Sequence, residues 1–203
     1  MRKGSKDFTP ENCNIMSRKE SDSKLEIGDD APEFELEDYK GEHVALSDLE
    51  NFDGVLVVFM CNHCPYVQTQ VNEIKQLAED FPSLAIVGVN ANVETHPMDS
   101  FEKMSDFIEG KELALPNFYY LADSEQEVAE SYGAKCTPDP FLLDYRHKLF
   151  YHGKLNDKEG SEDEPEERYM KEAVQKMLKR KEPPTEQPPS VGCSIKWKDT
   201  VSN

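Results

Sequence analysis

The sequence contains no long apolar run, and its N-terminus is polar. No stretch approaches the roughly 18 to 20 consecutive apolar residues that cross a bilayer, so no transmembrane helix is predicted. The first residues also lack the apolar segment of a secretory signal peptide. These absences predict a cytoplasmic protein, in which cysteines are normally reduced.

Positive charge is scarce. The chain has 23 lysines and arginines against 41 aspartates and glutamates, which gives a net charge of −18. This excess argues against nucleic acids and anionic membranes as partners, because both repel an acidic surface. Cysteine is also sparse, and five residues mostly far apart do not resemble a disulfide-stapled scaffold. Any disulfide is therefore expected to be transient.

Residues 55–71 are the most informative stretch and read V-L-V-V-F-M-C-N-H-C-P-Y-V-Q-T-Q-V. The apolar run at 55–60 is typical of a strand buried on both faces of a parallel sheet. Pro65 suits the first position of a helix, and apolar residues at helical spacing extend that helix to about Asp80. Cys64 therefore falls at the N-cap, where unsatisfied N–H groups and the helix dipole favour an anion such as a thiolate.

Two interpretations of these cysteines are open. Cysteine is among the most buried residue types, so Cys61 and Cys64 are compatible with core residues near a helix start. The polar residues Asn62 and His63 lie between them, and a proline fixes the helix start beside the second sulfur. These features favour a reactive thiol at the end of a parallel strand, where open α/β sheets keep their sites.

The remaining patterns predict alternating strands and helices. Alternating residues at 33–37, a turn around Gly41 and a return strand at 43–46 predict an N-terminal β-hairpin. The strand at 55–60, its helix and a buried strand at 84–90 form a βαβ unit with parallel strands. The other expected elements are helices at 98–108, 124–132 (with Ser124 as N-cap) and 166–181, an extended segment at 118–121, and a β-hairpin formed by 141–143 and 148–152.

Composition divides the chain into three parts. Residues 1–24 are polar and are predicted to be a disordered tail, residues 25–182 form the folded domain, and residues 183–203 form a proline-rich linker and C-terminal segment. An acidic loop at 156–167 is expected to be solvated. The terminal V-G-C-S-I-K-W-K includes the only tryptophan, Trp197, which gives this segment a reason to dock on the domain.

Three segments carry a resemblance to a known superfamily. They are I-G-D-D-A-P-E-F-E-L near the start, V-L-V-V-F-M-C-N-H-C-P-Y-V, and G-A-K-C-T-P-D-P-F-L-L-D. On these segments, residues 26–182 resemble the thioredoxin-like superfamily, in particular the redoxin branch of peroxiredoxins and membrane-tethered thiol reductases. C-N-H-C-P-Y-V with the terminal G-C-S-I-K-W resembles a peroxiredoxin-like subgroup. The resemblance implies a three-layer α/β/α sandwich with a central mixed sheet and an N-terminal β-hairpin, and the activity of a thiol-dependent oxidoreductase.

The resemblance also implies roles for particular residues. Thr137-Pro138 corresponds to the cis-proline site that faces the reactive cysteine, although an ordinary trans turn is the alternative. The Thr137 backbone would then pair with an extended substrate as an added strand. In the reductase branch the first cysteine follows the strand phenylalanine by five places, and counting from Phe59 this position is Cys64. The usual second cysteine corresponds to Val67, which cannot form a disulfide.

The chain departs from the peroxiredoxin pattern in two places. Cys61 stands where peroxiredoxins carry a threonine. The arginine that they place near the cis-proline is missing, because Lys135 and Pro138 occupy that neighbourhood. Both departures weaken the case for efficient peroxide reduction. Neither excludes it, and disulfide exchange and peroxide reduction both stay open.

A second thiol must resolve Cys64 after it has been oxidised. Cys61 is the nearest in sequence, Cys136 precedes the expected cis-proline, and Cys193 is a further candidate if the tail folds back. His63 adjoins Cys64 and is expected to contact substrate or to stabilise the thiolate. The expected partners are a protein or small-molecule disulfide or a peroxide, together with a reducing partner, and no cofactor is expected.

Metal binding is the alternative function. Cys61, His63 and Cys64 lie within one turn and offer soft ligands for copper or zinc, without an evident fourth ligand. A third alternative is a binding module that keeps the fold without redox turnover.

Overall fold

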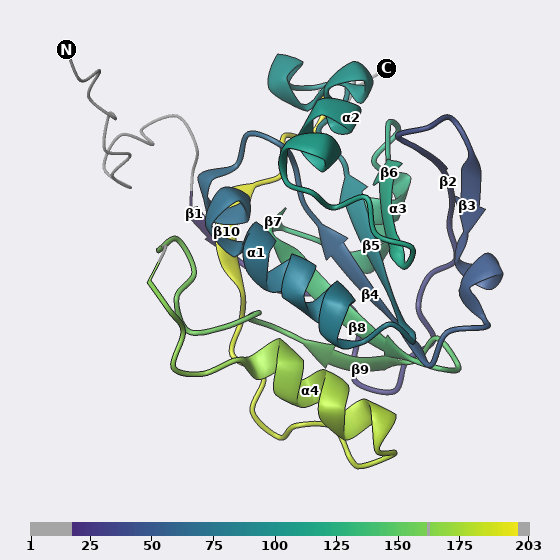
Figure 1. Ribbon diagram of the computed structural model, residues 1–203, viewed down its shortest axis with the longest axis vertical. Helices are drawn as coiled ribbons and strands as arrows, with labels where there is room; N and C mark the ends of the chain where they lie inside the picture. Colours follow the sequence, from purple (N-terminus) through teal and green to yellow (C-terminus); the bar gives the residue numbers. More distant parts are fainter. Residues whose placement is uncertain (1–17, 162, 199–203) are drawn as a thin grey trace.

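The computed structural model describes residues 18–161 and 163–198, and its centre is a mixed β-sheet (Figure 1). The three central strands pair in parallel, and the strands on either side of them are antiparallel to their neighbours. The order across this seven-stranded sheet is β3 (His43–Ala45), β2 (Glu35–Asp38), β6 (Phe118–Ala122), β5 (Leu84–Asn90), β4 (Gly54–Phe59), β8 (Asp139–Asp144) and β9 (Leu149–His152).

Helices cover both faces of this sheet. They are α1 (Pro65–Asp80), α2 (Phe101–Gly110), α3 (Glu127–Tyr132), α4 (Tyr169–Leu178) and the 3-10 turn η2 (Leu46–Leu49). Leu56 and Val58 of β4 pack with α1, α2 and α4, whereas Val55 and Val57 pack with α3 and η2. In Figure 1, α1 crosses in front of the central strands. This is a three-layer α/β/α sandwich with a mixed central sheet and an N-terminal hairpin of β2 and β3, which confirms the predicted fold class.

The two ends of the described chain meet in a second, smaller sheet. β10 (Val191–Ser194) lies between β1 (Arg18–Glu20) and β7 (Cys136–Thr137) and is antiparallel to both. The disorder predicted for residues 1–24 is therefore wrong for β1, because pairing with β10 satisfies backbone groups that the polar sequence alone leaves to water. Residues 1–17, which include Cys13, lie outside the described residues.

The helix predicted at 98–108 is interrupted. A 3-10 turn, η3 (Pro97–Asp99), comes first, and α2 begins only after Ser100, whose ψ of 157° is not helical. The Asp99 side chain is fully buried in this interruption. The helical spacing of the apolar residues therefore predicted α2 correctly. It could not show that a buried carboxylate, Asp99, ends the turn before it.

The helix predicted from Ser124 begins later than expected. Gln126 has a left-handed backbone with φ 64°, so α3 starts at Glu127. The carboxylate of Asp123 accepts hydrogen bonds from the N–H groups of Val128 and Ala129 and supplies the cap that was assigned to Ser124. Gly133 ends the helix with a left-handed backbone of φ 68°.

The acidic segment at 156–167 is not solvated throughout. The side chain of Glu159 is only 5% exposed, and its carboxyl group bonds the Ser190 hydroxyl and the Val191 N–H. The last helix, α4, follows this segment and is shorter than the predicted range of 166–181. No helix within the described residues is long and apolar enough to cross a membrane, and the cytoplasmic location stays a prediction.

Candidate active site

Cys64 immediately precedes α1, as the sequence predicts. Pro65 is in the first turn, and Cys64 is the N-cap residue with φ −66° and ψ 121°. The sulfur therefore lies where the fully buried strand β4 gives way to the positive end of the helix dipole. Cys64 is buried, and its thiol donates a hydrogen bond of 3.1 Å to the carbonyl oxygen of Thr137.

Thr137 brings the second expected part of the site to the cysteines. The Thr137–Pro138 peptide bond is cis and joins β7 to β8. The Thr137 hydroxyl lies 3.7 Å from the sulfur of Cys61, while its carbonyl contacts Cys64. One residue of the proline loop therefore touches both sulfurs.

The C-terminal strand β10 completes a cluster of three thiols. In its antiparallel register with β7, Cys193 pairs with Thr137. The side chain of Cys193 forms a hydrogen bond with Cys64, and so does that of Cys61. The segment docks through buried Cys193 and Ile195, whereas Trp197 stays 46% exposed. The backbone edge at which an extended substrate was expected to pair is thus filled by the chain itself.

The environment shifts the pKa values of the neighbouring thiols of Cys64 and Cys61 in opposite directions. Burial acts to raise the pKa of Cys64, but hydrogen bonds with Cys193, Cys61 and Thr137 and with the Val67 N–H outweigh it, so the pKa lies well below its usual value. The hydrogen bond to the Thr137 carbonyl acts in the opposite direction, because it favours the protonated Cys64 thiol, but the hydrogen bonds that lower the pKa are more numerous. Burial raises the pKa of Cys61, and the hydrogen bond to Cys64 and the charge of a nearby carboxylate add to this effect. Cys64 is therefore the more acidic thiol of the pair.

Cys136 has a different environment. Its sulfur lies 3.6 Å from the carbonyl oxygen of Pro138. Burial, with smaller contributions from the charges of Asp139 and Glu159, raises the pKa of Cys136 far above its usual value. A buried thiol of this kind is a poor nucleophile at neutral pH.

A buried carboxylate, Asp99, was missed by the sequence analysis. It accepts a hydrogen bond from the backbone N–H of His63 at 3.0 Å, and its carboxylate is also within hydrogen-bond distance of Nδ1 of the His63 ring. The His63 ring stacks on His96 with centroids 3.6 Å apart, and its Nδ1 lies 3.7 Å from the Cys61 sulfur. His63 therefore faces Cys61 and Asp99. His96, through this stacking, also belongs to the site.

The loop between β4 and α1 is held from both sides. The Asn62 amide donates to the Met98 carbonyl at 3.1 Å, and its oxygen accepts from the buried Tyr120 hydroxyl at 2.8 Å. No local sequence signal identifies Asp99 or Tyr120, because each meets the loop through contacts that span 36 or more residues. A polar pair such as Asn62-His63 beside a cysteine is the only sequence hint that buried partners exist.

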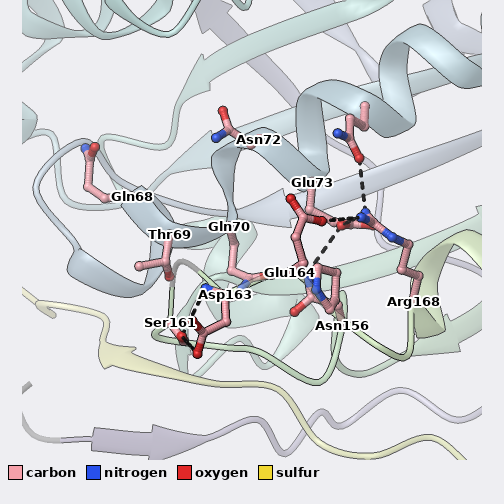
Figure 2. Close-up of a pocket in the computed structure, with 12 residues that line it drawn as sticks. Gln68, Thr69, Gln70, Asn72, Glu73, Asn156, Ser161, Asp163, Glu164 and Arg168 are labelled. Carbon is pink, nitrogen blue, oxygen red and sulfur yellow. Dashed lines mark hydrogen bonds and ion pairs between the residues drawn. The ribbon is translucent and has the colours of Figure 1, made fainter.

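A cavity of about 380 Å³ lies elsewhere, between the polar face of α1 and the acidic segment (Figure 2). Its described lining residues include no cysteine. Figure 2 shows the Arg168 guanidinium bonded to the Glu73 carboxylate, and Arg168 also donates to the Gln76 side chain at 3.1 Å. The charged groups of this cavity thus bond other lining residues, and no thiol is among the described residues of the lining.

Comparison with known proteins gives this geometry a context. The model of the AhpC/TSA family matches residues 27–152. The chain is 29% identical over 142 residues to the thiol-disulfide oxidoreductase ResA of Bacillus subtilis (strain 168), a match that covers 66% of this chain and 69% of that protein.

Two solved structures are similar over nearly the whole chain. An uncharacterized conserved protein from Geobacillus kaustophilus is 37% identical with a TM-score of 0.84, covering 92% of this chain and 99% of that one. A hypothetical protein from Sinorhizobium meliloti 1021 is 33% identical with a TM-score of 0.82, covering 89% and 98%. The similarity therefore extends beyond the family match and includes segments on both sides of it.

Proposed function

Because the chain belongs to the AhpC/TSA family and is an oxidoreductase, we propose that Cys64 is its nucleophile in thiol–disulfide exchange or peroxide reduction. The observation that carries the proposal is the position of the Cys64 sulfur at the N-cap of α1, among hydrogen-bond donors that lower its pKa. Thr137, Pro138 and His63 form the walls against which substrate would bind.

The chemistry follows from the thiolate. On a disulfide, the Cys64 sulfur forms a new S–S bond, and the departing sulfur leaves as a thiolate. On a peroxide, it takes one oxygen and becomes a sulfenic acid, and an alcohol or water leaves. A second thiol then attacks the Cys64 sulfur, forms an intramolecular disulfide and releases the bound thiol or a water molecule. An external dithiol returns both cysteines to the reduced state.

The geometry favours two of the three candidate resolving thiols. Cys61 and Cys193 both contact Cys64 through their side chains. The Cys136 sulfur is instead directed at the Pro138 carbonyl. We propose that Cys61 or Cys193 resolves the intermediate, and Cys61 is the one of the two that stays beside Cys64 whatever β10 does.

Replacing the nucleophile tests the proposal. Cys64→Ser should abolish turnover of both a disulfide and a peroxide substrate when reduction is followed with excess dithiol. Cys136→Ser is the matched control and should retain most of the activity, since it removes an equally buried thiol that does not face the substrate. Mass mapping after limiting oxidant should find Cys64 in a disulfide with Cys61 or Cys193. Full turnover by Cys64→Ser would exclude the mechanism.

Metal binding stays a second candidate, with a donor set different from the predicted one. Sulfur, nitrogen and oxygen ligand atoms of Cys61, His63 and Asp99 lie within 4.8 Å of one another, and Asp99 takes the place assigned to Cys64. Zinc accepts this mixture of ligands. If the site holds zinc, the protein retains about one equivalent after dialysis, and Asp99→Asn loses it while the exposed control Asp106→Asn does not. Wild-type protein without stoichiometric metal would exclude this function.

A further inference from the structure

β10 occupies the place that an extended substrate would take beside the proline loop. Cys193 is opposite Thr137, and Ser194 is opposite Cys136, in an antiparallel pair. The Cys193 side chain contacts Cys64. A cysteine of this chain therefore lies where the sulfur of a substrate would meet the nucleophile.

The register of this pair requires a glycine. A Cβ atom on Gly192 would lie 2.1 Å from the carbonyl oxygen of Thr137 and 2.6 Å from its carbonyl carbon. Both atoms belong to the backbone of the cis-proline loop, so they cannot turn aside as the end of a flexible side chain can. A chain in this register therefore needs glycine immediately before its cysteine.

β10 is fastened on both sides of this pair. Upstream, the Ser190 hydroxyl bonds the Pro138 carbonyl at 2.9 Å, and the Val191 N–H donates to Glu159 at 3.1 Å. Downstream, the N–H of Lys196 donates to the Asn92 side chain at 2.9 Å. Cys64 is 0% exposed and its side chain contacts Cys193 of β10, so we expect that β10 must move before a substrate reaches the sulfur.

We propose that the edge of β7 at the Thr137–Pro138 bond is a binding site for an extended peptide with a Gly-Cys pair, and that residues 190–195 are its resident occupant. The proposal rests on the function proposed for Cys64. An incoming segment displaces β10 and pairs with Thr137 through its backbone. The Cys64 thiolate attacks the cysteine sulfur of the segment's disulfide, a mixed disulfide forms, and the other sulfur leaves as a thiolate. Attack by the Cys61 thiolate on Cys64 then releases the peptide cysteine.

The first experiment measures how well β10 protects Cys64. Full-length wild type and Gly192→Val are treated with iodoacetamide, and mass spectrometry follows the labelling of Cys64. The labelling rates are compared per Cys64 thiolate, using the Cys64 titration of each protein, because displacing Cys193 also changes the pKa of Cys64. On that basis labelling in Gly192→Val should be about tenfold faster or more, because the added side chain cannot fit against Thr137. Ser190→Ala, which removes one anchor without adding bulk, should be intermediate. Equal labelling in all three proteins, with circular dichroism spectra that show them folded, would overturn the proposal.

The second experiment asks what the vacated edge accepts. A synthetic peptide with the sequence of residues 189–197 carries its cysteine as a mixed disulfide with thionitrobenzoate, whose release is coloured. Full-length Gly192→Val should release it about tenfold faster than from a control peptide with valine in place of glycine. Wild type should react more slowly than the variant with the glycine peptide. Equal rates with both peptides would show that the site does not require glycine before the cysteine and would contradict the proposal.

A small aromatic disulfide distinguishes failure of the proposed peptide-binding site from failure of Cys64 as the nucleophile. If Gly192→Val reacts at Cys64 with this reagent but shows no preference between the peptides, the binding site is wrong and the function of Cys64 stands. If Cys64 is inert toward the reagent and both peptides in the folded variant, the proposed function itself fails. Adding Cys64→Ser to Gly192→Val identifies the reacting sulfur in either case.

Discussion

At the scale of single residues, Cys61 and Cys64 show how three residues of separation produce opposite acidities. Burial acts on both, but Cys64 has several hydrogen-bond donors, whereas Cys61 lies near the negative charge of Asp99. The Cys64 thiolate and the Cys61 thiol therefore form an asymmetric pair. Such a pair has a built-in direction, because the thiolate attacks and the neighbouring thiol is spared for the second step.

The acidity of Cys64 should depend on Cys193. Cys193→Ala removes the hydrogen bond from that side chain, which is the strongest of the influences that lower the pKa of Cys64. The pKa of Cys64 should therefore rise, so that less thiolate is present at neutral pH and the rate of attack falls there but recovers as the pH is raised. Thiolate absorbance measured against pH reports this shift.

Cys136→Ala serves as the control for that titration, since its sulfur bonds the Pro138 carbonyl. It should leave the midpoint of Cys64 nearly unchanged. If both substitutions leave the midpoint in place, Cys193 does not stabilise the thiolate and the arrangement of the three thiols needs another explanation.

The sequence was informative about Cys64 because its signals are local. A buried strand, a helix start and a proline lie within residues 54–65 and fix where the sulfur falls. Asp99 gave no such signal, because it meets His63 from a turn 36 residues away. His63 was expected beside the Cys64 thiolate, and only the fold could show that its ring is bound by Asp99 instead.

At the scale of elements, β10 depends on a carboxyl group from a segment that looked merely solvated. The Ser190 hydroxyl has one hydrogen, and it lies 2.9 Å from the Pro138 carbonyl and 2.8 Å from Glu159. When that hydrogen bonds the carbonyl, the contact with Glu159 is favourable only if Glu159 carries a proton. Burial raises the pKa of Glu159 to about 7, although the hydrogen bonds from Ser190 and the Val191 N–H and the charge of Lys154 act in the opposite direction.

Glu159→Gln should therefore stabilise the protein in a pH-dependent way. A raised pKa means that protonated Glu159 favours the folded state, and this stability is fully present below about pH 4.5 and lost as the pH rises through about 7. The neutral amide mimics the protonated acid at every pH. The unfolding free energy of the variant should match that of wild type near pH 4.5 and exceed it by about 2 to 3 kcal/mol above pH 7.

Urea unfolding at several pH values measures this difference, with hydrogen exchange of the Val191 amide as a local readout. Glu164→Gln, whose side chain is 95% exposed, is the matched control and should show no such trend. A destabilised Glu159→Gln protein at pH 8 would mean that the ionised carboxylate, and not the acid, holds β10.

Elements with strong local patterns were predicted well, and short paired elements were not. The bounds predicted for α1 and β5 agree with the structure, because each has enough apolar residues at regular spacing to identify it alone. β1 has three exposed residues and exists only through pairing with β10, some 170 residues later. No short stretch of sequence contains both strands. Trp197 therefore indicated that the C-terminal segment docks, but the sequence could not predict that this segment pairs beside Cys64.

At the scale of the whole molecule, charge is the dominant feature. The whole chain has a net charge of −18, so like charges repel one another over its surface. Exposed ion pairs such as Lys75 with Glu112 and Lys171 with Asp80 relieve this only locally. Dissolved salt screens the remainder over about 10 Å at 0.1 M.

Stability should consequently increase with ionic strength. Raising sodium chloride from about 0.01 M to 0.5 M shortens the screening length and reduces the repulsion among carboxylates. A gain of about 1 kcal/mol in unfolding free energy would raise Tm by about 2–4 °C for a chain of this size. Calorimetry at pH 7.5 in both salts measures it, and a fall in Tm would show that attractive surface pairs outweigh the net repulsion.

The placement of β10 between β1 and β7 also has a mechanical consequence. Arg18 is opposite Cys193 and Glu20 is opposite Val191, so the outward-leading end of each strand lies at the same end of the pair. A load applied through the two ends of the chain would separate the strands like a zipper, one hydrogen bond after another, instead of shearing them all at once. Tension between the termini, for instance in an optical trap, would therefore detach β10 at low force and expose the thiols of Cys61 and Cys64 while the seven-stranded sheet stays intact.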